Sequence, residues 1–169
     1  KWLPGASEGI TVAGGNGKGS SANQLDYPRG VVLDSSGNLY VLDQFNHRVQ
    51  KWLPGASEGI TVAGGNGSGS AANQLKKPNI IAIDISGYLY ITDGSNHRVQ
   101  KWLPGASEGT TVAGGNGSGS DANQLNRPRG IVLDASGNLF ISDRYNHRIQ
   151  KWLPGASKGI TVAGGNGAG

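Results

Sequence analysis

A repeat of fifty residues constrains this chain more than any other feature. The segment KWLPGASEGITVAGGNG begins at Lys1 and returns at Lys51, at Lys101 with Thr110 in place of isoleucine, and at Lys151 with a lysine in place of glutamate. The segment between the copies is written only three times. Periods of about 20 to 50 residues are typical of solenoids, propellers and arrays, in which each unit buries its apolar faces against its neighbours.

Every apolar run within one unit has the character of a β-strand. GVVLD, LYVLD, NHRVQKW and GITVAG are short and rich in β-branched and aromatic residues, and turn sequences such as DSSGN and LPGASEG separate them. VVL, IAI and IVL are apolar without alternation, which a strand needs when both faces of its sheet are covered. We therefore predict an all-β fold of four-stranded antiparallel propeller blades, with GITVAG as the outer strand.

The composition narrows the possible chemistry. The chain contains no cysteine and no methionine, which excludes disulfides and a thiol nucleophile, and its net charge is +4. No apolar stretch approaches the roughly 18 residues that cross a bilayer, so we expect no membrane partner. The serines after Asn66-Gly67 and Asn116-Gly117 complete glycosylation sequences at Asn66 and Asn116, which slightly favours an extracellular location.

Aspartate and histidine recur together, as Asp43 with His47, and again in the next two units. A catalytic zinc site needs about three ligands on one ion. Because equivalent residues lie on separate blades, we expect each aspartate to bind the backbone of its own loop and to pair with an arginine. The sequence thus predicts a non-catalytic chain without metal or cofactor.

The repeated residues resemble a known family. Pro28, Arg29 and Gly30, then VVLDSSGNLYVLD, then NHRVQ from Asn46, and TVAGGNG followed by ANQL and a proline, are similar to the NHL repeat. The resemblance implies a propeller, most often six-bladed, that binds proteins or RNA through one face. A minority of the family are enzymes, including a metal-dependent amidating lyase, which remains an alternative. Asn79 and Ile80 depart from the Arg-Gly of the other units, so we expect the second blade to begin differently.

The three units disagree mainly at two places. Before the first strand the chain reads DYPRG, KKPNI and NRPRG, and after the second strand LDQFN, TDGSN and SDRYN. Propeller geometry places both segments on one face, here called the top face. Its cations and aromatic rings suit RNA, an acidic protein or a sulfated glycan, although exposed loops also tolerate drift. The predicted ligand residues are Tyr27, Arg29, Phe45, Lys76, Lys77, Arg127, Arg129, Arg144 and Tyr145.

The unequal copy number predicts self-assembly. We expect an outer half-blade and crossover over residues 1–27, then blades over residues 28–77, 78–127 and 128–169. Three blades form an arc with an apolar face bare at each end, and such faces favour association. Two chains would close a six-bladed ring as a homodimer, or the same head-to-tail contact would propagate into a fibre. A structural, fibre-forming role is therefore an alternative function beside the lyase.

In the ring, the copies from Lys1 and Lys151 compete for one rim position. We expect the copy from Lys151 to keep its place, because the strand that leads into it is unbroken. The opening copy then pairs elsewhere as an extra edge strand, or it displaces its rival as a donated strand.

Overall fold

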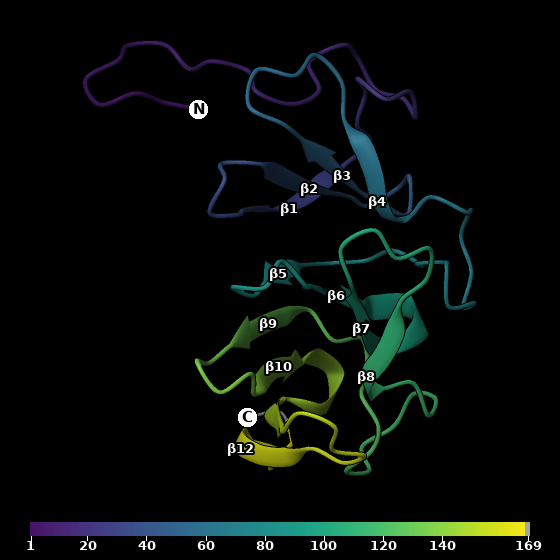
Figure 1. Ribbon diagram of the computed structural model, residues 1–169. Coiled ribbons are helices and arrows are strands. Elements are labelled where there is room, and N and C mark those ends of the chain that lie inside the picture. Colours follow the sequence, from purple (N-terminus) through teal and green to yellow (C-terminus); the bar gives the residue numbers. More distant parts are fainter. Residues whose placement is uncertain (168–169) are drawn as a thin grey trace.

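The computed structural model describes residues 1–167 and contains three separate four-stranded antiparallel sheets. The sheets follow one another along an arc, with the N-terminal segment projecting from one end (Figure 1). In each sheet the strands are arranged in chain order, as in a propeller blade. The predicted all-β blade architecture is confirmed. Within residues 1–167, no helix has the length and apolar character needed to cross a membrane.

Each blade has the same four strands. Blade 1 consists of β1 (Pro28–Leu33), β2 (Leu39–Asp43), β3 (Arg48–Trp52) and β4 (Ile60–Gly64). Blade 2 consists of β5 (Ile81–Ile83), β6 (Leu89–Asp93), β7 (Arg98–Trp102) and β8 (Thr110–Gly114). Blade 3 consists of β9 (Gly130–Leu133), β10 (Leu139–Asp143), β11 (Arg148–Trp152) and β12 (Ile160–Gly164). Short 3-10 helices, η1 (Gly94–Asn96) and η2 (Arg144–Asn146), connect the second and third strands of blades 2 and 3.

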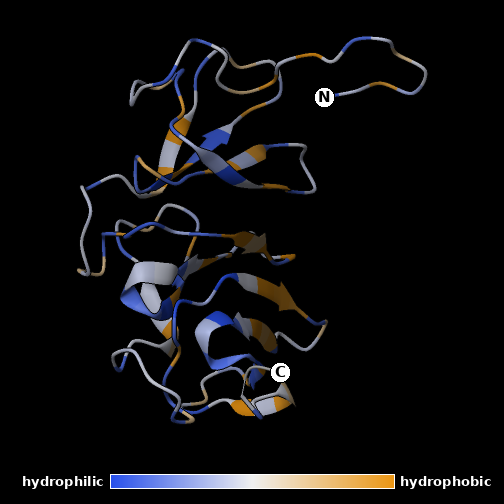
Figure 2. Cartoon of the chain, turned by 180° about the vertical axis from the view of Figure 1, so that it is seen from behind, coloured by the Kyte–Doolittle hydropathy of each residue, from blue (hydrophilic) through white to orange (hydrophobic). Residues whose placement is uncertain are grey.

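The apolar core lies between the blades. At the first junction Leu42 and Val49 of blade 1 pack with Ile81 and Ile91 of blade 2, and Leu75 from the crossover completes the cluster. Val99, Leu125, Ile131 and Ile141 repeat this arrangement at the second junction. Figure 2 shows the apolar colour concentrated on the strands and the polar colour on the connecting loops. Both faces of a blade are therefore apolar, which explains the strands without alternation.

Each crossover is hydrogen-bonded to the blade that follows it. The Gly109 N–H, at the rim of blade 2, donates to the Ala72 carbonyl at 2.9 Å, and Gly59 and Gly159 make the same bond to Ala22 and Ala122. The packing unit is thus a crossover together with the next blade.

The entry of blade 2 carries two departures from the repeat. Strand β5 starts at Ile81, one repeat position later than β9 and three positions later than β1. The Asn79 amide donates to the Pro128 carbonyl at 3.2 Å, and a Cβ added at Gly94 would overlap this amide. The two departures of blade 2, Asn79 and Gly94, therefore fit each other.

The opening copy forms a hairpin that does not pair with any of the three sheets. The Lys1 amino group donates to the Ile10 carbonyl at 2.7 Å and the Ile10 N–H to the Lys1 carbonyl at 2.8 Å, the register of Lys51 and Ile60 in blade 1. No strand is assigned within residues 1–27, so the extra edge strand is not formed in the single chain. Trp2 is 68% exposed, whereas Trp52 is 1% exposed.

Candidate binding face

Backbone hydrogen bonds join the two variable segments of each blade. The Phe45 N–H donates to the Asp26 carbonyl at 3.1 Å, and Ser95 and Tyr145 donate in the same way to Lys76 and Asn126. The segment that enters each blade therefore lies against the loop between its second and third strands. The structure thus brings the two variable segments of every blade together on the top face.

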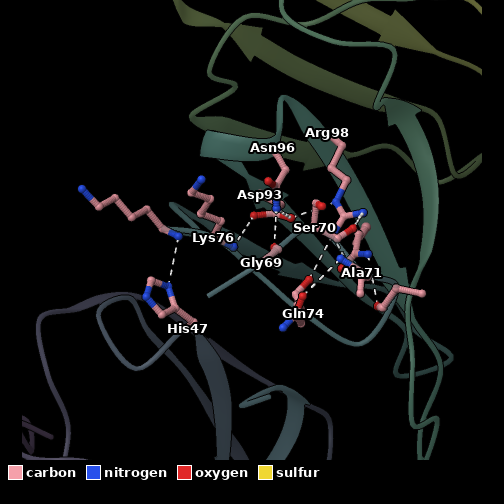
Figure 3. Close-up of polar contacts among 12 residues, drawn as sticks. His47, Gly69, Ser70, Ala71, Gln74, Lys76, Asp93, Asn96 and Arg98 are labelled. Carbon is pink, nitrogen blue, oxygen red and sulfur yellow. Dashed lines mark hydrogen bonds and ion pairs between the residues drawn. The ribbon is translucent and has the colours of Figure 1, made fainter. Parts of the chain in front are cut away.

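A buried aspartate holds this loop pair in each blade, and Figure 3 shows the one in blade 2. In blade 2 Asp93 accepts hydrogen bonds from the Lys76 N–H at 2.7 Å and from Asn96 Nδ2 and Arg98 Nε at 2.8 Å. The Arg98 guanidinium also donates to the carbonyls of Ser70, Ala71 and Gln74. Burial raises the pKa of the Asp93 carboxyl, and its hydrogen bonds from Asn96, Lys76 and Arg98 oppose that shift. Asp43 and Asp143 repeat the arrangement with Arg48 and Arg148.

The histidines join one blade to the next. His47 Nδ1 accepts the Lys77 N–H at 3.2 Å, and His97 Nδ1 accepts the Arg127 N–H at 3.1 Å. Desolvation lowers the pKa of both histidines, which favours the neutral ring that can accept this bond. The three aspartates, His47 and His97 therefore have structural partners, and within residues 1–167 no three His, Cys, Asp or Glu side chains are grouped as a metal site.

The sequence pattern Gly-x-Ser-x-Gly occurs in each outer turn, for example as GASEG at 55–59. In α/β-hydrolases this pattern places a nucleophilic serine between a strand and a helix. Here it joins the antiparallel strands β3 and β4, and no helix follows it. The turn thus lacks the context that would make the serine a nucleophile.

Exposed aromatic rings gather at blade 1. The rings of Tyr27 and Phe45 are stacked, with centroids 4.9 Å apart and an interplanar angle of 17°. The guanidinium carbon of Arg29 lies 5.2 Å from the centroid of the Tyr27 ring. Tyr27 and Phe45 remain 53% and 45% exposed, so the stack presents aromatic surface to solvent.

Blade 3 carries a second cluster of the same kind. The guanidinium carbons of Arg144 and Arg127 lie 5.0 and 5.8 Å from the centroid of the Tyr145 ring, which is 47% exposed. Lys76 and Lys77, both exposed, enter blade 2 between these two clusters, and Arg129 is exposed at the start of blade 3. The predicted ligand residues thus form two aromatic–arginine clusters, a lysine pair and one separate arginine.

The backbone at this face has a feature that the sequence analysis missed. Tyr27, Lys77 and Arg127 have φ of 58°, 47° and 50°, in the left-handed region that costs about 1 kcal/mol or more for residues with a side chain. The three residues occupy equivalent positions, immediately before the proline of each blade. Glycine or asparagine at these positions would have predicted a left-handed backbone, but the sequence has tyrosine, lysine and arginine there. The conformation is therefore known only from the packed loops of the structure.

The charge of the top face is positive. The acidic groups near this face are paired. Asp26 pairs with Lys18 at 3.6 Å, and the buried aspartates Asp43, Asp93 and Asp143 each pair with an arginine. The variable cations are exposed to solvent, so they dominate the electrostatic potential that an approaching ligand meets. These exposed cations are Arg29, Lys76, Lys77, Arg127, Arg129 and Arg144.

The two asparagines of the glycosylation sequences have a structural role. Nδ2 of Asn66 donates to the Asn73 carbonyl at 3.1 Å, and Nδ2 of Asn116 donates to the Asn123 carbonyl at 3.0 Å. Asn16, which lacks the serine, makes the same bond to Asn23. Glycosylation of Asn66 or Asn116 stays a prediction, and it would compete with this bond.

Comparison with known proteins identifies the repeat. The family description that matches is NHL repeat, at residues 25–52 and 125–152. No curated protein sequence matches the chain.

Several solved structures share the fold. A structural genomics protein of unknown function from Bacteroides thetaiotaomicron is similar over 81% of this chain and 36% of its own, at 21% identity and a TM-score of 0.64. A chain of a nidogen/laminin complex is similar over 85% of this chain and 51% of its own, at 21% identity and a TM-score of 0.65. Virginiamycin B lyase from Staphylococcus aureus is similar over 83% of this chain and 42% of its own, at 12% identity and a TM-score of 0.60.

These similarities concern the fold, and the chain spans about half or less of each of these structures. The matched repeats each run from the end of a crossover through the third strand of a blade. The three blades give the chain a β-propeller type of fold, and the two matched segments, residues 25–52 and 125–152, are consistent with the NHL-repeat β-propeller family.

Proposed function

We propose that this protein is a non-catalytic binding module whose top face holds single-stranded RNA. The observation that supports this proposal most strongly is the pair of exposed aromatic–arginine clusters, Tyr27 with Phe45 and Arg29, and Tyr145 with Arg127 and Arg144. The exposed Lys76 and Lys77 lie between the clusters. Single-stranded nucleic acid binds to surfaces of this kind, because bases stack on aromatic rings and cations contact phosphates.

Base stacking and phosphate contacts differ in how strongly they depend on salt. A base stacked on an aromatic ring contributes about 1–3 kcal/mol and depends little on salt. Each cation that neutralises a phosphate of a single strand contributes about 0.7 to the slope of log K against log salt. Binding measured across a salt series therefore separates the rings from the charges.

The test uses a fluorescent single-stranded oligouridine and measures anisotropy over a salt series. Replacing Lys76, Lys77, Arg127 and Arg129 together with alanine should weaken binding and flatten the salt slope. The matched control replaces Lys1, Lys51, Lys101 and Lys151, which changes the net charge equally. Lys51, Lys101 and Lys151 lie near the ends of the third strands away from the top face, and Lys1 lies in the opening hairpin. Equal affinity and slope in the two variants would contradict the proposal.

The aromatic part is tested by Tyr145→Ala, which should weaken binding about 5- to 150-fold without changing the salt slope. Tyr145→Phe keeps the ring and should retain most of the affinity. If sulfated glycan or an acidic peptide binds tightly and the oligouridine does not, the ligand class proposed here is wrong.

A further inference from the structure

We propose that the two bare ends of the arc are complementary, and that each docks onto a second copy of this chain. The head surface lies on the outer side of blade 1 and consists of Leu25, Val31, Leu33 and Leu39. The tail surface lies on the outer side of blade 3 and consists of Val132, Phe140, Ile149, Val162 and Ala163.

The two internal junctions show what the head surface is built to contact. Ile81 and Ile131, the counterparts of Val31 in blades 2 and 3, are 4% and 7% exposed because the preceding blade covers them. Val31 and Leu33 are 64% and 62% exposed. The head surface is thus the same side of a blade that is buried twice within the chain.

The tail surface shows the matching difference. Ala63 and Ala113 are 2% exposed, whereas their counterpart Ala163 is exposed. Val132 and Val162 are 62% and 48% exposed, although the equivalent Val32 and Val62 pack against the first junction. Each surface therefore retains the residues of a junction and lacks only its partner.

A leucine and a hollow fit each other across this contact. Leu75 is fully buried, and its Cδ1 lies 3.0 Å from the place of a Cβ at Gly64; Leu125 occupies the same place beside Gly114. On blade 3 the corresponding place is an open hollow of about 280 Å³, lined in part by Ile149, Ala163 and Gly164. Leu25 is only half-buried in its own chain. Leu25 of a second copy would fill this hollow.

Two polar groups are also left without their junction partners. At the internal junctions a backbone N–H of the following blade donates to a histidine Nδ1, from Lys77 to His47 and from Arg127 to His97. The equivalent pair is the Tyr27 N–H and His147 Nδ1, and neither has a hydrogen-bond partner within residues 1–167. Tyr27 has the left-handed backbone of Lys77 and Arg127, so its N–H is already placed for this bond.

With three blades in each chain, two such contacts related by a two-fold axis would close a ring of six blades. In this ring the opening copy of one chain and the closing copy of the other would meet at one place. Residues 10–16 and 160–166 have the same sequence, ITVAGGN, and only one of the two segments can lie beside β11. Residues Ile160–Gly164 already pair with β11, whereas residues 1–14 pair with no sheet. We therefore expect β12 to stay and the opening copy to be displaced.

The test is sedimentation velocity of the full chain at micromolar concentrations. The unaltered chain should sediment with the mass of two chains. Val31→Asp on the head and Val132→Asp on the tail should each give monomers, since both positions are exposed in the single chain and would be buried in the proposed contact. Leu103→Asp, at a 47% exposed position in an outer turn away from both surfaces, is the matched control and should keep the two-chain mass.

A mixture of the two variants makes the test specific for a head-to-tail contact. An equal mixture of Val31→Asp and Val132→Asp retains one intact head and one intact tail, so it should recover a two-chain species at higher concentration. A monomeric unaltered chain would overturn the proposal, as would a head variant or a tail variant that still dimerises by itself. Masses that grow beyond two chains and vanish in both variants would support the contact and overturn the closure of the ring.

Discussion

At the scale of single residues, His47 and His97 are the groups whose ionisation affects the junctions between blades. Each accepts a backbone N–H of the next blade through Nδ1, and protonation of Nδ1 removes the acceptor. Desolvation lowers the pKa of both rings below the ordinary value of about 6.5. The unfolded chain therefore binds more protons than the folded chain in the interval just below pH 6.5.

The first prediction follows from that difference. The contribution of these histidines to the free energy of unfolding should be complete above about pH 6.5 and should be lost as the pH falls through their folded pKa values. Urea unfolding at pH 7.5 and pH 5.5 measures the loss, in the Val132→Asp background that keeps the chain open. Replacing His47 and His97 with glutamine should reduce the pH dependence more than His147→Gln, the matched control at a position without this bond. An equal pH dependence in all three proteins would contradict this assignment.

At the scale of elements, the beginning of blade 2 shows two departures from the repeat that compensate each other. Blade 1 has Arg29 and Gln44, and the Gln44 amide donates to the Pro78 carbonyl at 2.9 Å. Blade 2 has Asn79 and Gly94, and the Asn79 amide takes over the bond to the next blade, at Pro128. The connection between blades is thus retained, although a different residue makes it.

The second prediction is a double-mutant cycle on this pair. Gly94→Gln alone should lower the free energy of unfolding by about 1–3 kcal/mol, because the new side chain overlaps the Asn79 amide. Adding Asn79→Arg restores the residue pair of blade 1 and should recover at least half of that loss. Chemical denaturation of the four proteins gives the coupling, and additive effects would show that the two positions act independently.

At the scale of the whole molecule, the ring proposed above would place the opening copy of one chain and the outer strand of blade 3 of the other at the same position. Residues 1–13 belong to no sheet. In the single chain Leu25 packs against Gly14, with its Cδ1 3.0 Å from the place of a Cβ at Gly14. Assembly of the ring would break this contact, because the opening copy would have to move. The opening copy therefore opposes assembly in the arrangement proposed above.

The third prediction is that deletion of residues 1–13 tightens the association of two chains. Sedimentation over a concentration series should give a lower dissociation constant than for the full chain. Deletion of residues 1–9 alone leaves Ile10–Gly14 in place and should have a smaller effect, which makes it the matched control. Weaker association after the longer deletion would show that the opening copy is a donated strand rather than a displaced one.

The sequence by itself determined the blade. The fifty-residue period, the strands without alternation and the turn residues predict four antiparallel strands per unit, and the structure has them at the expected places. The grouping of Tyr27 with Phe45 and of Arg127 and Arg144 with Tyr145 was also predictable as a shared face, because strand direction decides which loops meet. These properties are local or repeat identically, so one unit is enough to infer them.

Only the tertiary structure decided the properties that depend on a neighbour. Identical copies of KWLPG give a buried Trp52 and an exposed Trp2, because Trp2 has no blade to pack against. His47 Nδ1 accepts the Lys77 N–H, whereas the equivalent His147 Nδ1 has no partner within residues 1–167, where the structure describes no blade beside β11 and β12. A repeat encodes both sides of a junction in every unit, but burial and hydrogen bonding arise only where two units meet.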